Sequence, residues 1–149
     1  MIDKNCETEK NLQIESKDLD HLGIVAGIVD EIGLVFEINK LVGTNEQELV
    51  TSGQVVKAMI LNCMGFLSAP LYLFWQFFKG KPFAHLLGEG VKAEHLNDTR
   101  LGRVLDKLYE IGLTRVFMAV VLKAASKFDV RCKSKHFRLE FLSCSWYIF

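Results

Sequence analysis

Cysteine is scarce in this chain, and its few cysteines form no recognisable metal-binding pair. The 149 residues include four cysteines, none of them in a C-x-x-C pair. Cys132, His136 and Cys144 are near one another in the sequence, but they lack the fourth ligand and the tight spacing of a structural zinc site. The polar, acidic start MIDKNCETEK also lacks the features of a signal peptide. We therefore expect a cytoplasmic protein with reduced thiols and no bound metal.

The chain has no net charge, but its charges are unevenly distributed. Residues 1–50 carry 4 basic and 11 acidic side chains, whereas residues 114–149 carry 7 basic and 2 acidic ones. This asymmetry is consistent with a later half that faces an anion, and equally with a solvated charge pattern that has no partner.

Between residues 20 and 128 the chain shows no repeat, low-complexity tract or linker, which indicates one domain. Apolar residues recur there at helical spacing, and glycines or capping residues separate the segments. Residues 1–11 are expected to be disordered, and residues 11–19 to form a short strand. The pattern predicts an all-α bundle of about six helices with short loops. The expected segments are 21–33, 34–43, 52–67, 70–80, 99–111 and 114–128, with a short turn at 82–88.

Residues 58–78, AMILNCMGFLSAPLYLFWQFF, contain no charged side chain. As one helix these 21 residues would be about 31 Å long, enough to cross a bilayer core. However, Thr51-x-x-Gln54 forms a capping box just before the run, and amphipathic helices on both sides need an apolar partner. We therefore expect two core helices that meet at Ser68-Ala69-Pro70, and no membrane span.

No catalytic constellation is evident. GEGVKA at residues 88–93 is similar to a phosphate-binding loop, but a helical turn precedes it where that loop requires a strand. His85 and His95 have no nucleophile or carboxylate partner at a recognisable spacing.

One helix face suggests nucleic-acid binding. Arg100, Arg103 and Lys107 are spaced to share one side of the helix over 99–111, opposite much of its apolar stripe. Such a face can contact phosphates, and arginines also reach base edges. Because Asp106 and Glu110 are nearby, a salt-bridged exposed face is the alternative.

Three long stretches carry a family resemblance: LDHLGIVAGIVDEIGL, GQVVKAMILNCMGFLSAPLYLFWQFF and HLLGEGVKAEHLNDTRLGRVLDKLYEIGLTRVF. In this order they resemble the N-terminal domain of bacterial insertion-sequence transposases of a type abundant in cyanobacteria. The resemblance covers roughly Leu12 to Ser134, with Trp75 in place of an expected proline and Asp129 in place of a glycine. It implies a role with transposon-end DNA. Those enzymes also carry an RNase H-like catalytic domain whose DDE triad binds two Mg²⁺ ions.

The last residues depart from that family. Its catalytic domain is expected to begin with a strand similar to HLDSSSFHVHG, in which Asp is the first metal ligand, but here Arg138 stands at that position. Inserting one nucleotide into a coding sequence chosen for that motif reproduces His136 to Ile148 without a mismatch. We interpret residues 135–149 as a frameshifted, irregular tail that follows a helical domain over 12–134.

The expected function is that of a truncated, catalytically inactive transposase fragment. Its partners would be transposon-end DNA through Arg100, Arg103 and Lys107, intact transposase, or a second copy. It would have no cofactor of its own, since the two Mg²⁺ ions belong to the missing catalytic domain. It would be cytoplasmic, or associated with the nucleoid when bound to DNA. The alternative is a helical dimerisation module that does not bind DNA.

Overall fold

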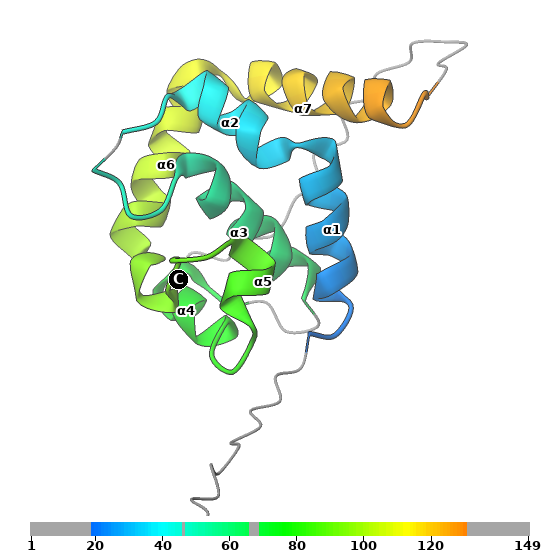
Figure 1. Ribbon diagram of the computed structural model, residues 1–149. Coiled ribbons are helices and arrows are strands. Elements are labelled where there is room, and N and C mark those ends of the chain that lie inside the picture. Colours follow the sequence, from blue (N-terminus) through cyan, green and yellow to red (C-terminus); the bar gives the residue numbers. More distant parts are fainter. Residues whose placement is uncertain (1–18, 46, 66–68, 131–149) are drawn as a thin grey trace, which may run out of the picture.

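The computed structural model describes residues 19–45, 47–65 and 69–130, and all regular structure in those ranges is helical (Figure 1). This confirms the all-α class. Of the other predictions, the disordered start, the strand over 11–19 except Leu19, the Cys132 cluster and the tail over 135–149 lie outside the described residues. The helices are α1 (Leu22–Ile32), α2 (Leu34–Val42), α3 (Ser52–Met64), α4 (Phe74–Phe77), α5 (Phe83–Leu87), α6 (Asp98–Ile111) and α7 (Leu113–Lys127), with 3₁₀ turns η1 (Leu71–Leu73) and η2 (Ala93–His95).

Helix α3 lies at the centre of the fold and contacts α1, α2, α5 and α6 (Figure 1). Its predicted start is confirmed, because the Thr51 hydroxyl accepts a hydrogen bond from the Gln54 backbone N–H at 3.3 Å and the Gln54 carboxamide accepts one from the Thr51 N–H at 2.9 Å. This capping box satisfies two backbone donors at the helix start. The helix then buries the side chains of Val55, Ala58 and Leu61.

Helices α2 and α3 approach so closely that only glycine fits at position 53. A Cβ atom there would lie 2.3 Å from the Val35 carbonyl oxygen, well inside van der Waals contact. The Gly53 N–H donates to the Asn39 side-chain oxygen at 2.7 Å, and the Asn39 amide donates to the Thr51 hydroxyl at 3.2 Å. These bonds tie Asn39, near the end of α2, to Thr51 and Gly53 at the start of α3.

The uncharged run over 58–78 is divided, as predicted, but its two parts differ from the predicted helices. Helix α3 ends at Met64 rather than near Leu67. The buried Asn62 side chain exchanges two 2.9 Å hydrogen bonds with the Ala69 backbone, which places Ala69 closer to Asn62 than a continuous helix would allow. Instead of one helix over 70–80 there are η1 and the single-turn α4, since Leu73, with φ −110° and ψ 9°, departs from α-helical geometry. In the described ranges, no helix is long and apolar enough to cross a membrane.

Helix α7 lies along the outside of the bundle, where it contacts α2, α6 and α1 and extends past α1 (Figure 1). Its end is a Schellman-type turn: Asp129 has a left-handed φ of 47°, and the Val130 N–H donates to the Ala125 carbonyl at 3.0 Å. Glycine is usual in that conformation, and position 129 is where the family resemblance calls for glycine.

Candidate functional site

The three basic residues predicted to contact DNA lie on α6, whose register is set by a cap. The Asn97 side chain accepts a hydrogen bond from the Arg100 N–H at 2.8 Å, which caps the start of the helix. Arg100, Arg103 and Lys107 share one side of the helix, but this side is adjacent to the buried stripe and not opposite it. The prediction of an opposite face was wrong because, at about 100° per residue, the centre of this side lies only about 100° around the helix from the centre of the buried stripe. The buried stripe consists of Leu101, Val104 and Leu108.

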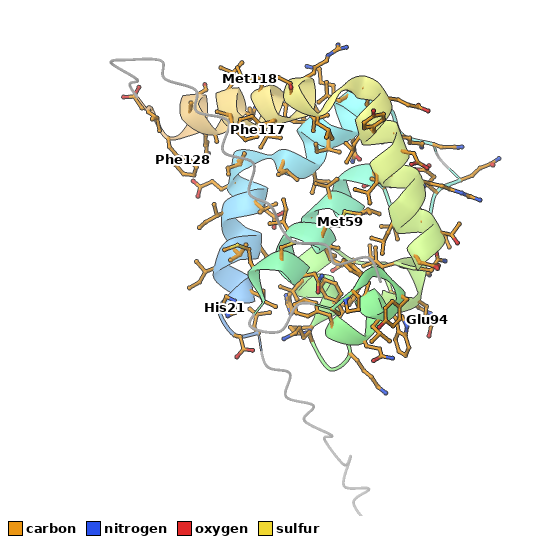
Figure 2. The ribbon with its side chains drawn as sticks, turned by 180° about the vertical axis from the view of Figure 1, so that it is seen from behind. His21, Met59, Glu94, Phe117, Met118 and Phe128 are labelled. Atoms are coloured by element: carbon orange, nitrogen blue, oxygen red, sulfur yellow. The ribbon has the colours of Figure 1, made fainter. Side chains whose placement is uncertain are left out.

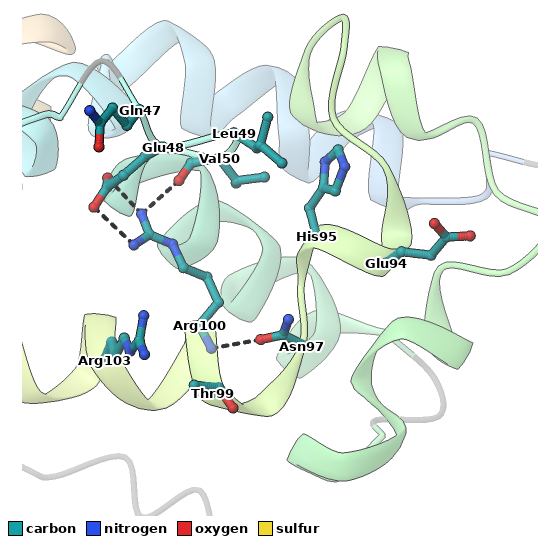
Figure 3. Close-up of a pocket in the computed structure, with 10 residues that line it drawn as sticks. All are labelled: Gln47, Glu48, Leu49, Val50, Glu94, His95, Asn97, Thr99, Arg100 and Arg103. Carbon is teal, nitrogen blue, oxygen red and sulfur yellow. Dashed lines mark hydrogen bonds and ion pairs between the residues drawn. The ribbon is translucent and has the colours of Figure 1, made fainter.

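Two of the three basic side chains are held by one carboxylate. The Arg100 guanidinium donates two hydrogen bonds to Glu48, at 3.0 and 2.7 Å, and a third to the Val50 carbonyl at 2.6 Å (Figure 3). The Lys107 ammonium lies 3.3 Å from the same carboxylate. Because Glu48 and Arg100 are only 16% and 17% exposed, their bidentate pair is largely shielded from water. We call Glu48, Arg100 and Lys107 the Glu48 clamp; it fastens the α2–α3 segment to α6.

The clamp also determines the charge state of Glu48. Hydrogen bonding from Arg100 holds the pKa of the Glu48 carboxyl below its ordinary value, and the charges of Arg100 and Lys107 act in the same direction, against the opposite effect of burial. Glu48 is therefore ionised at neutral pH and neutralises part of the basic side of α6.

Arg103 differs from its two neighbours: it is exposed and makes no ion pair with any of the described residues. It borders an open cleft of about 470 Å³ at the start of α6 (Figure 3). Two arginines and two glutamates line this cleft, so its charges balance. The lining residues are Gln47, Glu48, Leu49, Val50, Glu94, His95, Asn97, Thr99, Arg100 and Arg103.

The remaining sequence candidates have structural roles or none. The GEGVKA segment joins α5 to η2 with no strand before it, so it does not have the setting of a phosphate loop. His95 accepts a hydrogen bond from the Lys92 N–H at 3.2 Å, which caps η2. Within the described ranges, no group of three His, Cys, Asp or Glu side chains is placed to hold a metal ion.

Sequence reasoning missed Glu48, which decides how available the basic side chains are. It is 52 residues from Arg100 in the chain and falls in a segment with no periodic pattern, so no local signal pairs the two. Lys57 was also missed. Its side chain is 3% exposed and pairs with Asp30 of α1 at 2.6 Å, across 27 residues of the chain. Both pairs depend on how helices are arranged in space.

A comparison with known protein families matches residues 14–122 to a family described as a domain of unknown function, DUF4277. The match covers more than half of the chain and spans all of the fold from α1 into α7. No curated protein and no solved structure was found to be similar to the chain. On the extent of the family match, the chain belongs to the DUF4277 family.

Proposed function

We propose that this chain carries the helical N-terminal domain of an insertion-sequence DDE transposase, a domain that acts at transposon ends in DNA binding or complex assembly. The support is the resemblance of three long stretches, which correspond to α1, to α3 with α4, and to the segment from α5 into α7. We propose no catalytic activity and no cofactor for the chain itself. Metal-assisted phosphoryl transfer requires carboxylate ligands, and Arg138 stands where the resemblance expects the first of them.

The observation behind the DNA role is the basic side of α6, which is open to solvent at Arg103. Arg103 is the lead contact in this proposal, because its guanidinium is free to donate to a phosphate or a base edge. Arg100 and Lys107 contribute less, since Glu48 already accepts their hydrogen bonds. We therefore expect weak binding with few phosphate contacts and a shallow dependence on salt.

The test is an electrophoretic shift assay with the terminal repeats of the element at increasing salt. Arg103→Ala should weaken binding and lower the salt slope by about one phosphate contact. Arg115→Ala is the matched control, because this exposed arginine is on α7 and not on α6. Absence of binding by the unaltered protein at about 50 mM salt, where phosphate contacts are strongest, would contradict the DNA role.

A second variant tests whether the clamp limits DNA binding. Glu48→Gln removes the negative charge that occupies Arg100 and Lys107, so it should tighten DNA binding and steepen the salt slope. If Glu48→Gln folds and binds no better, Arg100 and Lys107 are structural residues only.

The Glu48 clamp also favours a second candidate function, a helical interaction module that does not bind DNA. With two of three cations neutralised within the chain, the basic side of α6 is explained as a structural contact. A stable DNA-independent dimer without affinity for terminal repeats would select this candidate. Light scattering combined with the shift assay separates the two.

A further inference from the structure

Helix α7 covers only part of its apolar surface: Val116 and Val120 are partly buried against the core, and other apolar side chains are exposed. No residue of α7 is fully buried by the described part of the chain. Its lysines point toward the bundle, where Lys123 lies 3.5 Å from Glu37 of α2 and Lys127 lies 3.9 Å from Glu31 of α1. Apolar side chains are left facing water, and Phe117 and Phe128 lie along one side of the helix (Figure 2). An exposed apolar face of this kind normally marks an interaction site.

The exposed Phe117 and Phe128 share a narrow seam with the half-buried Val121 and Ala124. Phe117, Val121, Ala124 and Phe128 are spaced by four, three and four residues, which is the spacing of a coiled-coil seam and places them within an arc of about 60°. Phe117 and Phe128 are 49% and 47% exposed. We call these four residues the α7 seam. No charged side chain belongs to it.

We propose that the α7 seam pairs with the α7 seam of a second copy of this chain, with the two helices antiparallel. The order of side-chain sizes along the seam is large, small, small, large, so it reads nearly the same from either end. In an antiparallel pair each Phe117 meets the Phe128 of the other copy, and each Val121 meets an Ala124. A twofold axis requires such self-complementarity, and the small central residues let the helices approach closely.

The exposed apolar area of the α7 seam and the charges around it are compatible with a second copy of the chain as the occupant. The seam and its exposed neighbours offer roughly 400 Å² of apolar surface per copy, if a fully exposed aromatic side chain contributes about 200 Å². Two such faces correspond to a small interface of about 800 Å², so the dimer should be weak and should depend on concentration. Antiparallel helices also place opposite ends of their dipoles together, and the paired lysines lie away from the seam. The exposed neighbours are Leu113 and Val130.

The first test is the mass in solution, measured by light scattering from low micromolar to near-millimolar concentration. We expect the mass to rise from the 16.9 kDa of one chain toward twice that value. Phe117→Glu should abolish the rise, whereas Tyr109→Glu, which alters a 76% exposed residue of α6, should leave it unchanged. Unchanged helix content by circular dichroism shows that both variants fold.

Two results would overturn the pairing. The first is a dimer that persists in Phe117→Glu. The second is an unaltered chain that stays monomeric at every concentration. In that case hydrogen exchange would show whether α7 is protected and whether Phe117→Glu removes the protection. Such a loss would indicate another occupant, such as residues 131–149. The pairing does not depend on the DNA role, because the shift assay probes α6 and the mass measurement probes α7.

Orientation is tested by cross-linking with all four native cysteines changed to serine. A mixture of Phe117→Cys and Phe128→Cys chains should form the mixed disulfide. Neither variant alone should link efficiently, because residue 117 of one copy would be about 16 Å along the axis from residue 117 of the other, too far for a disulfide. Efficient linking of Phe117→Cys to itself would indicate parallel helices and contradict the proposal.

Discussion

Helices α6 and α7 are adjacent in the chain and similar in length, yet they relate to the core in opposite ways. Helix α6 buries Leu101, Val104 and Leu108, and its basic side is fastened by the Glu48 clamp. Helix α7 has no fully buried residue within the described part of the chain. Only Val116 and Val120 are partly buried against the core, whereas Phe117 and Phe128 are about half exposed. This difference is the basis of our proposal that α7 pairs with a second copy, whereas α6 packs into the core.

The difference between α6 and α7 is tested most strongly by changing one leucine on each helix to alanine. Leu101 is fully buried, so Leu101→Ala should lower the free energy of unfolding by about 3 kcal/mol through lost burial and the cavity left behind. Leu122 is 59% exposed and lies off the seam, so Leu122→Ala should change the free energy of unfolding by less than about 0.5 kcal/mol. Urea unfolding measures both values. Similar losses would mean that α7 belongs to the core after all.

The ion pairs of the two helices should also differ. Glu48→Gln leaves the Arg100 guanidinium without its charged partner in a largely shielded site, and should cost about 1–2 kcal/mol. Glu37→Gln breaks a pair whose lysine is 48% exposed, and should cost well under 1 kcal/mol. Urea midpoints at low and high salt would check this, with the Glu37 effect shrinking at high salt. A Glu48 effect no larger than that of Glu37 would remove the reason to call the clamp structural.

The position of α6 in the sequence was predictable from local chemistry, whereas its tertiary contacts were not. Apolar spacing identified the helix, as Thr51 and Gln54 identified the start of α3. The clamp escaped prediction because Glu48 and Arg100 meet only through tertiary packing. Sequence reasoning also extended the helix that begins at Ser52 to Leu67, because apolar spacing does not reveal the hydrogen bonds between the Asn62 side chain and the Ala69 backbone.

The clamp makes the stability of the contact between Glu48 and α6 depend on pH. Since the pKa of Glu48 is lowered in the folded protein, the clamp stabilises the fold fully above the ordinary glutamate pKa. This stabilisation is lost as the pH falls from the ordinary value through the lower folded one. The free energy of unfolding, measured from neutral to acidic pH, should therefore fall less steeply in Glu48→Gln than in the unaltered protein. Parallel curves would show that Glu48 does not contribute to the acid sensitivity.

The smallest expected effects are two glycine substitutions of opposite sign, one on each helix. Asp129 ends α7 with a left-handed φ of 47°, where a side chain is strained, so Asp129→Gly should raise the free energy of unfolding by about 0.5 kcal/mol. Asp106→Gly, in the exposed interior of α6, should lower it by about 0.5 kcal/mol because glycine disfavours the helix. Thermal melts of the two variants, compared at one concentration so that self-association is equal, would resolve the signs. If Asp129→Gly is destabilising, an interaction of the Asp129 side chain outweighs the backbone strain, and the turn at the end of α7 is held by that side chain.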